Sequence, residues 1–243
     1  MKLSDFEVLT FDCYGTLIDW ESGITAALQP LLARAKPPLA GDAVLQAFAR
    51  HEAAQETETP GMIYSDLLSV VHRRLAEQWG VPPDATEDAR FGASVPDWPA
   101  FSDSASALAY LKRHYRLVIL SNVDRASFAG SAPKLGVAFD AVYTAEDIGS
   151  YKPDPRNFAY LIEKLAGQGF GKRDILHVAQ SLYHDHVPAE DAGLTSAWID
   201  RRHAVGGSGA TSVPTRAPRY AWRFDSLAAL ADAHRGEQPA TVR

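Results

Sequence analysis

The sequence LTFDCYGT at residues 9–16 decides the fold class of this chain. An apolar run ends there on a carboxylate, Asp12, and is followed by a tight turn at Gly15 and a hydroxyl at Thr16. A buried strand that stops on an acid places that acid at the strand's carboxyl end, where open α/β sheets bind their ligands. We therefore expect Asp12 to serve as a nucleophile at such an edge.

Further runs of β-branched and aliphatic residues predict strands at Leu117–Leu120, Ala141–Thr144, Ile175–Ala179 and Ser196–Ile199. Helical patterns alternate with them at Ser104–Arg113, Asp124–Ala132 and Asn157–Leu165, and Tyr220–Ala231 holds a last strand and helix. Strands separated by helices indicate a mostly parallel sheet, and right-handed crossovers bring the strand carboxyl ends to one edge. The sequence thus predicts an α/β fold, a Rossmann-like parallel sheet with helices on both faces.

Residues 19–100 form a distinct segment, because no strand pattern interrupts them. Helices are expected there at Glu21–Ala35, Asp42–Glu56 and Ile63–Trp79, and Val95–Pro99 would return the chain to the core. We predict a core of residues 1–18 and 101–235, an inserted helical cap at 19–100 and a frayed tail at 236–243. A cap over a strand-end site would exclude water and supply specificity.

Composition and charge exclude several classes of protein. The net charge of -6 over 243 residues, without a run of Lys and Arg, argues against a nucleic-acid surface. The N-terminus leads into the first strand without an apolar leader, and no stretch approaches a membrane span, so we expect a cytoplasmic protein without membrane contact. The only cysteine, Cys13, rules out an internal disulfide and a thiolate metal cluster, and the histidines lack paired spacing.

Polar residues also follow the later strands. Ser121 and Asn122 come directly after the run 117–120, and their hydroxyl and amide could hydrogen-bond an anionic group. Lys152 lies in a Pro-stiffened turn, and the segment 179–185 ends in another acid, Asp185. Taken alone, Ser-Asn after a strand is more often a helix cap, and a lone loop lysine is usually solvated.

In order and spacing, these segments resemble the haloacid dehalogenase-like superfamily over nearly the whole chain. Its phosphatases have DxDxT in the first segment, a Ser or Thr in the second, a Lys in the third and a pattern similar to GDSxxxD in the fourth. Asp12, Ser121, Lys152 and Asp185 match these positions. Tyr14 replaces the second Asp of DxDxT, so the first segment looks like that of the L-2-haloacid dehalogenase branch.

Two departures from the phosphatase pattern favour carbon–halogen chemistry. The resemblance implies that the acid replaced by Tyr14 protonates a leaving alcohol, whereas a halide leaves without a proton. Gln180 replaces an acid that helps to hold Mg²⁺, a cation that prefers charged oxygen ligands. We therefore expect no metal and no other cofactor, and Mg²⁺ would be needed only if the chain were a phosphatase.

The resemblance implies an (S)-2-haloacid dehalogenase acting on short-chain 2-haloacids. Asp12 would displace halide from C2, and water would hydrolyse the resulting aspartyl ester. Lys152 would keep Asp12 ionised, and Asp185 would orient Lys152 or the water. Two alternatives stay open: a phosphatase acting on a small phosphorylated metabolite, and a non-catalytic binding protein of the same fold.

The same resemblance assigns substrate contacts. Ser121 and Asn122 would hold the substrate carboxylate, Thr16 would brace Asp12, and Tyr14 would wall a halide cradle. Members of the family also use an Arg of the cap at the halide, and Arg50 is the best candidate.

The sequence leaves several features of the site undecided. His184 either hydrogen-bonds the halide or water or is structural, and Gln180 leaves the positioning of water open. The preferred halogen and the natural substrate are not fixed either. Because the family often forms dimers, a homodimer is one expectation for the oligomeric state.

Overall fold

The computed structural model describes residues 1–39 and 41–238, built around a sheet of six parallel strands. The strands are β1 (Val8–Phe11), β2 (Arg116–Ser121), β3 (Ala141–Thr144), β4 (Ile175–Ala179), β5 (Thr195–Ile199) and β6 (Trp222–Phe224). Their order is β3-β2-β1-β4-β5-β6, so the chain winds in both directions away from β1. Such a reversal opens a crevice at the strand carboxyl ends, where ligands bind. The predicted α/β fold is confirmed.

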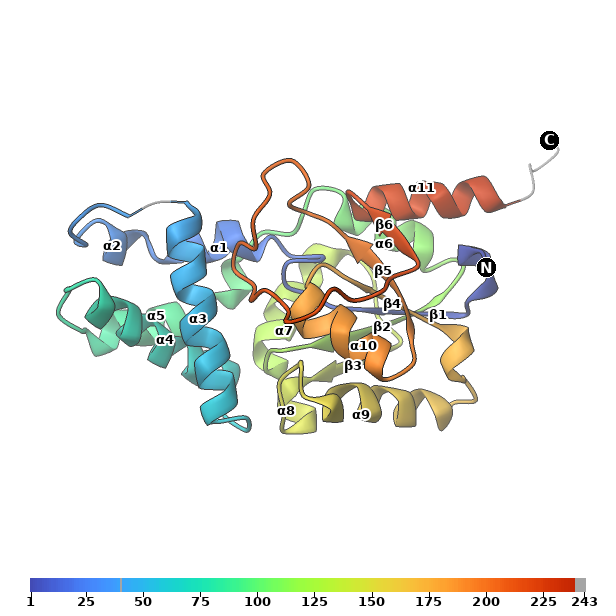
Figure 1. The fold of residues 1–243 in the computed structure, drawn as a ribbon, viewed down its shortest axis with the longest axis horizontal. Helices are drawn as coiled ribbons and strands as arrows, with labels where there is room; N and C mark the ends of the chain where they lie inside the picture. The colour runs from blue at the N-terminus through green and yellow to red at the C-terminus, as the bar shows by residue number, and fades with distance from the viewer. Residues whose placement is uncertain (40, 239–243) are drawn as a thin grey trace.

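Helices cover both faces of this sheet (Figure 1). Val8, Val118 and Ile175 share one apolar cluster with α9 and α10, whereas Leu9 and Phe11 share the other with α6 and α11. Strands buried on both faces read as continuous apolar runs, which is why they are recognisable in the sequence. The helices of the core are α6 (Ser104–Leu111), α7 (Arg125–Ser131), α8 (Ala145–Ile148), α9 (Pro155–Ala166), α10 (Val187–Asp191) and α11 (Leu227–Glu237).

A helical lobe lies beside the core, at the left of Figure 1, and comes entirely from the segment between β1 and β2. The expected helix Glu21–Ala35 is divided after Ala27, because Pro30 has no N–H to continue the helical ladder. A helix that we did not expect starts after Asp84, whose side chain accepts two backbone N–H bonds. The helices are α1 (Trp20–Ala27), α2 (Gln29–Leu32), α3 (Asp42–Glu58), α4 (Tyr64–Gln78) and α5 (Ala85–Gly92).

The loop after β5 ties this cap to the core. Arg202 forms ion pairs with Glu21 on α1 and, at 2.7 Å, with Asp42 at the start of α3. Glu21 also accepts the backbone N–H of Ala210 at 3.0 Å. These contacts hold the cap over the carboxyl ends of the strands.

The last helix extends beyond the predicted end of the core at residue 235. α11 runs to Glu237, whose carboxylate accepts the backbone N–H groups of Leu3 and Ser4 at 2.9 and 2.8 Å. Residues 236 and 237 therefore belong to the helix rather than to a frayed tail, and residues 239–243 lie outside the described part.

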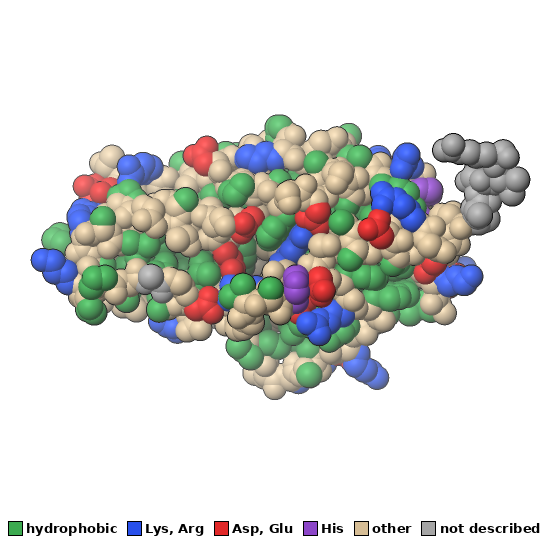
Figure 2. All heavy atoms as spheres, turned by 90° about the horizontal axis from the view of Figure 1, so that it is seen from above, with side chains coloured by type: hydrophobic (Ala, Val, Ile, Leu, Met, Phe, Trp, Pro, Cys, Tyr) green, Lys and Arg blue, Asp and Glu red, His purple; other side chains and the backbone are tan. Residues whose placement is uncertain are grey.

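Acidic and basic side chains are interspersed over the face seen in Figure 2, and acidic ones border its hollow middle. Within residues 1–39 and 41–238, no helix combines the length and the apolar character that crossing a membrane requires.

Candidate active site

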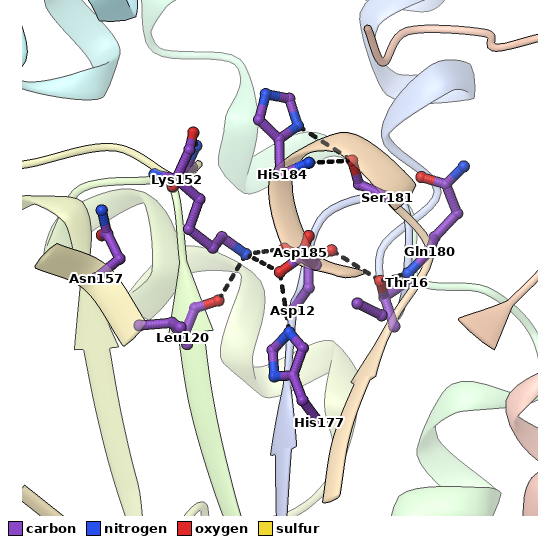
Figure 3. Close-up of polar contacts among 12 residues, drawn as sticks. Asp12, Thr16, Leu120, Lys152, Asn157, His177, Gln180, Ser181, His184 and Asp185 are labelled. Atoms are coloured by element: carbon purple, nitrogen blue, oxygen red, sulfur yellow. Dashed lines mark hydrogen bonds and ion pairs between the residues drawn. The ribbon is translucent and has the colours of Figure 1, made fainter. Parts of the chain in front are cut away.

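Side chains from four distant segments converge at the carboxyl ends of the central strands (Figure 3). Phe11 pairs with Ile119 and with Val178, so β1, β2 and β4 end at the same level. Asp12 directly follows β1, and Lys152 lies in the turn between α8 and α9. Asp185 lies in a single π-helical turn, Leu182–His186, after β4. Parallel topology thus brings together the residues that the sequence singled out.

The Lys152 ammonium is the centre of the site. Its Nζ donates to Asp12 Oδ1 at 2.9 Å, to Asp185 Oδ1 at 2.6 Å and to the Leu120 carbonyl at 3.0 Å, which uses all three protons. Burial alone would lower the pKa of Lys152, but the two carboxylates raise it above its ordinary value. The ammonium therefore stays charged and offsets one of the two negative charges.

Asp12 is held by the turn that follows it. Thr16 Oγ1 donates to Asp12 Oδ2 at 2.7 Å and accepts the backbone N–H of Gln180 at 2.9 Å. Gly15 has a φ of +91°, and a Cβ there would lie 2.9 Å from Trp20 Nε1, so the turn needs glycine. Burial raises the pKa of Asp12, Lys152 opposes that shift and Asp185 adds to it. An ionised Asp12 thus depends on its lysine neighbour.

Asp185 has a second buried partner, which the sequence reasoning missed. His177 Nε2 on β4 lies 3.0 Å from Asp185 Oδ1, and its Nδ1 lies 2.9 Å from Thr10 Oγ1. Burial alone would raise the pKa of Asp185, but Lys152 and the His177 hydrogen bond lower it below its ordinary range. Asp185 Oδ2 has no hydrogen-bond partner within the described residues. The signal in the sequence was a lone histidine inside the buried run 175–179.

A small pocket, with a cavity volume of about 30 Å³, lies between these residues and the cap. Tyr14 lines it, and its ring packs edge-on against Trp98 with centroids 5.7 Å apart. The Tyr14 hydroxyl donates to Ser131 Oγ at 3.0 Å, so its proton is already used. Ser121 also lines the pocket, and its Oγ has no hydrogen-bond partner in the described part of the chain. The core side of the pocket thus offers an aromatic wall and a free hydroxyl.

Arg50 does not reach this pocket, contrary to the prediction that it binds the halide. It is exposed on α3, and the pocket is lined instead by Glu52 and Glu56 of the same helix. At 3.6 residues per turn these two lie about 200° and 240° around the axis from Arg50. The face of α3 that carries Leu45 and Phe48 into the core continues to the two acids and turns Arg50 outward. Extending that apolar stripe by helical spacing would have identified both glutamates.

Asn122 connects the core to these acids. Its Nδ2 donates to Glu56 Oε1 at 3.0 Å and to the Lys152 carbonyl at 2.9 Å, and its Oδ1 accepts the Lys152 N–H at 2.7 Å. Both amide protons are therefore used, and Asn122 is not free to bind a substrate carboxylate as predicted. It positions the Lys152 backbone instead.

Glu52 and Glu56 are buried on the side of the cap that faces the core. Tyr64 donates its hydroxyl proton to Glu52 Oε1 at 2.5 Å. Burial raises the pKa of Glu52 to about 8, and burial together with the neighbouring Glu52 raises that of Glu56 well above its ordinary value. The Glu52 carboxyl group therefore favours the protonated form near neutral pH.

The His184 side chain lines the pocket, whereas the Gln180 side chain does not. The backbone of the π-helical turn carries His184 into the pocket, with Nδ1 3.2 Å from Ser181 Oγ and Nε2 3.8 Å from Glu56 Oε2. Burial lowers the pKa of His184 to about 4, so the imidazole is neutral. The Gln180 side chain points away from Lys152 and Asp12 (Figure 3), and only its backbone serves the site, through Thr16.

The arrangement does not fit a divalent cation. The Lys152 ammonium lies between Asp12 and Asp185, where it neutralises the two carboxylates that a metal would need. The Gln180 side chain is turned away, and within residues 1–39 and 41–238 no cluster of three or more His, Cys, Asp or Glu residues is placed to hold an ion.

Replacing Glu52 by Gln should stabilise the protein at alkaline pH. Because the folded-state pKa of Glu52 is raised to about 8, its contribution to stability is full below its ordinary pKa and is lost as pH rises through about 8. Glutamine keeps the shape and does not ionise. Thermal unfolding of both proteins is measured at about pH 5 and about pH 9. The Tm of Glu52→Gln minus the Tm of wild type should be at least ~3 °C larger at the higher pH, which corresponds to roughly 1 kcal/mol. A Tm difference that stays constant with pH would contradict the raised pKa.

Comparison with known proteins places this site among hydrolases. A family model described as haloacid dehalogenase-like hydrolase matches residues 6–193. An (S)-2-haloacid dehalogenase of Pseudomonas putida is 26% identical over 224 residues, which cover 84% of this chain and 88% of the relative.

Solved structures show the same fold with different ligands. The L-2-haloacid dehalogenase from Xanthobacter autotrophicus with chloropropionic acid covalently bound has a TM-score of 0.76 and 21% identity over 96% of this chain and 100% of that one. Bacillus subtilis YfnB bound to magnesium has a TM-score of 0.73 and 18% identity over 95% and 99%. Since the fold occurs in both settings, the residues of the site must distinguish the chemistry.

Proposed function

Because this chain belongs to the haloacid dehalogenase-like hydrolase family, we propose that it hydrolyses short-chain 2-haloacids with Asp12 as the nucleophile. The family resemblance of the sequence is thereby confirmed, and its relatives include (S)-2-haloacid dehalogenases. The observation that carries the proposal is the Lys152 ammonium between Asp12 and Asp185, whose charge opposes the rise in the pKa of Asp12 that burial causes and so favours the ionised nucleophile.

In the first step an Asp12 oxygen attacks C2 of the haloacid. A bond forms between that oxygen and C2 while the carbon–halogen bond breaks on the opposite side, and the halide leaves with the bonding electron pair. The edge of the Tyr14 ring carries partial positive charge and can face the departing anion. Ser121 Oγ, which lines the pocket and has no hydrogen-bond partner among residues 1–39 and 41–238, can donate to the substrate carboxylate. The products of this step are halide and an aspartyl ester with inverted C2.

In the second step water attacks the carbonyl carbon of that ester. Asp185 Oδ2, which has no other hydrogen-bond partner within the described residues, can accept a proton of the water in a hydrogen bond. Lys152 donates to Asp12 Oδ1 and Thr16 to Asp12 Oδ2, so the oxygen that remains the ester carbonyl keeps a donor that can stabilise the charge developing on it. As the bond between the carbonyl carbon and the ester oxygen breaks, one proton of the attacking water passes to the departing alkoxide to give the 2-hydroxy acid, and the other is lost to solvent as Asp12 returns to the carboxylate. The overall reaction consumes one water and releases halide and one proton.

The phosphatase alternative lacks a proton donor for a leaving alcohol. Tyr14 stands where such an acid would be, its hydroxyl proton is given to Ser131, and burial raises the pKa of Tyr14 well above its ordinary value. A halide needs no such donor. The same substitution therefore disfavours phosphate esters and leaves haloacids unaffected.

The protein should release chloride from (S)-2-chloropropionate in the presence of EDTA and yield the 2-hydroxy acid of opposite configuration. Ion chromatography quantifies the chloride, and chiral chromatography identifies the lactate enantiomer. The (R)-substrate and an aryl phosphate with added Mg²⁺ serve as comparisons, and we expect no turnover of either. Release of phosphate without release of halide from any 2-haloacid would refute the proposal.

A further inference from the structure

The charges that line the pocket are unbalanced. Lys152 is the only Lys or Arg among the described residues that line it, and its three protons are taken by Asp12, Asp185 and a backbone carbonyl. Glu52 and Glu56 add two further buried carboxyl groups on the cap side. Removing a carboxylate from water without a partner cation is costly, so these acids are either protonated or matched by a charge that a ligand brings.

An unused polar atom faces the same space. His184 is 8% exposed, and its Nε2 has no hydrogen-bond partner in the described part of the chain, with Glu56 Oε2 3.8 Å away. Because the imidazole is neutral, Nε2 can accept a hydrogen bond when Nδ1 carries the proton. Buried polar atoms are nearly always paired, so an unpaired one that lines a pocket indicates a ligand atom beside it.

We infer that the substrate of this site carries an ammonium group, which Glu52, Glu56 and His184 bind on the cap side of the pocket. The inference rests on the proposed function and names a substrate class for it: short-chain 2-halo acids with a primary amine at the far end of the chain. Their carboxylate would face Ser121, and C2 would face Asp12.

The chemistry of the three side chains suits an ammonium ion. It has three N–H donors and no acceptor, whereas two carboxylates and a neutral imidazole nitrogen supply three acceptors. Its charge would favour the ionised glutamates, which burial otherwise disfavours. Tyr64 and Asn122 already donate to one oxygen of each glutamate, and these contacts orient both carboxyl groups. A methyl group or a halogen cannot donate a hydrogen bond to any of these acceptors.

Paired substrates test the inference. The 2-chloro acids with a terminal amine on a chain of four, five or six carbons are each compared with the acid in which a methyl group replaces the ammonium. We expect kcat/KM for chloride release to favour the amine of the best-fitting pair by about tenfold or more, because close buried charge pairs couple by at least that factor. Glu56→Gln and Glu52→Gln should each reduce this preference severalfold.

A matched variant controls for general effects on α3. Glu58 lies on the same helix, is exposed and pairs with Arg74 at 2.7 Å, so Glu58→Gln should keep the preference for the amine. Equal kcat/KM values for amine and methyl substrates, or a preference that survives both pocket variants, would overturn the inference and leave the proposed function standing.

Binding separates the two hypotheses if no chloride is released. Calorimetric titration with the corresponding 2-hydroxy acids needs no turnover, and the amine member of the best-fitting pair should bind about tenfold more tightly than its methyl counterpart. Tight amine binding without chloride release would refute the proposed function alone. Equal binding of both members, or binding of neither, would refute the inference.

Discussion

Asp12→Asn should abolish halide release, with kcat reduced by about 10⁴-fold or more, because an amide is a poor nucleophile and the ester cannot form. The substitution should leave the rest of the site in place. Lys152 keeps its 2.6 Å contact to Asp185, so the variant contains a neutral buried pair rather than an unmatched charge. Chloride release and Tm measured on the same preparation separate the loss of chemistry from a loss of folding.

Labelled water identifies the atom that attacks. In a single turnover in ¹⁸O-water, the 2-hydroxy acid should receive unlabelled oxygen from Asp12, and the label should appear in the Asp12 carboxyl group. Mass spectrometry of the product and of the peptide that contains Asp12 gives both readings. Label that goes directly into the product, or an Asn variant within tenfold of wild type, would mean that water attacks C2 itself.

Much of this site is predictable from the sequence because parallel sheets have simple rules. A buried run that ends on Asp12 places the carboxylate at the strand's carboxyl end, and the crossovers bring Ser121, Lys152 and Asp185 to the same edge. These residues lie far apart in the sequence, and the topology of the parallel sheet brings them together. The bracing of Asp12 by Thr16 follows equally from the tight turn at Gly15.

The cap side was not predictable in the same way, because it depends on the rotation of a helix about its axis. Glu56 lies about 240° around the helix axis from Arg50, so the rotation of α3 decides which of the two faces the pocket, and both residues suit an amphipathic helix. The placement of His184 depends on the irregular turn at Leu182–His186, where the spacing of side chains differs from that of an α-helix. The irregular turn has no periodic signal, whereas the apolar stripe of α3 extends by helical spacing to both glutamates.

Lys152→Met should reduce kcat/KM at pH 7 by about 10³-fold or more and should also destabilise the fold. Methionine keeps the length of the side chain but leaves Asp12 and Asp185 as two buried like charges, and breaking a buried pair in this way costs about 3–5 kcal/mol. Because Lys152 opposes the rise in the pKa of Asp12, its removal should raise that pKa further. The nucleophile would then be protonated at pH values where the wild type is ionised, so the acid limb of the pH–rate profile should move to higher pH.

A second substitution distinguishes lost charge from lost packing. In Lys152→Met/Asp185→Asn the carboxylate beside Asp12 is also removed, so part of the lost Tm should return, and the interaction energy of the double-mutant cycle should be at least about 1 kcal/mol. The acid limb should move back toward its wild-type position, since Asp185 raises the pKa of Asp12. Turnover should stay low, because the ester would still lack its ammonium donor. A Lys152→Met variant whose acid limb coincides with that of the wild type would show that the ammonium does not keep Asp12 ionised.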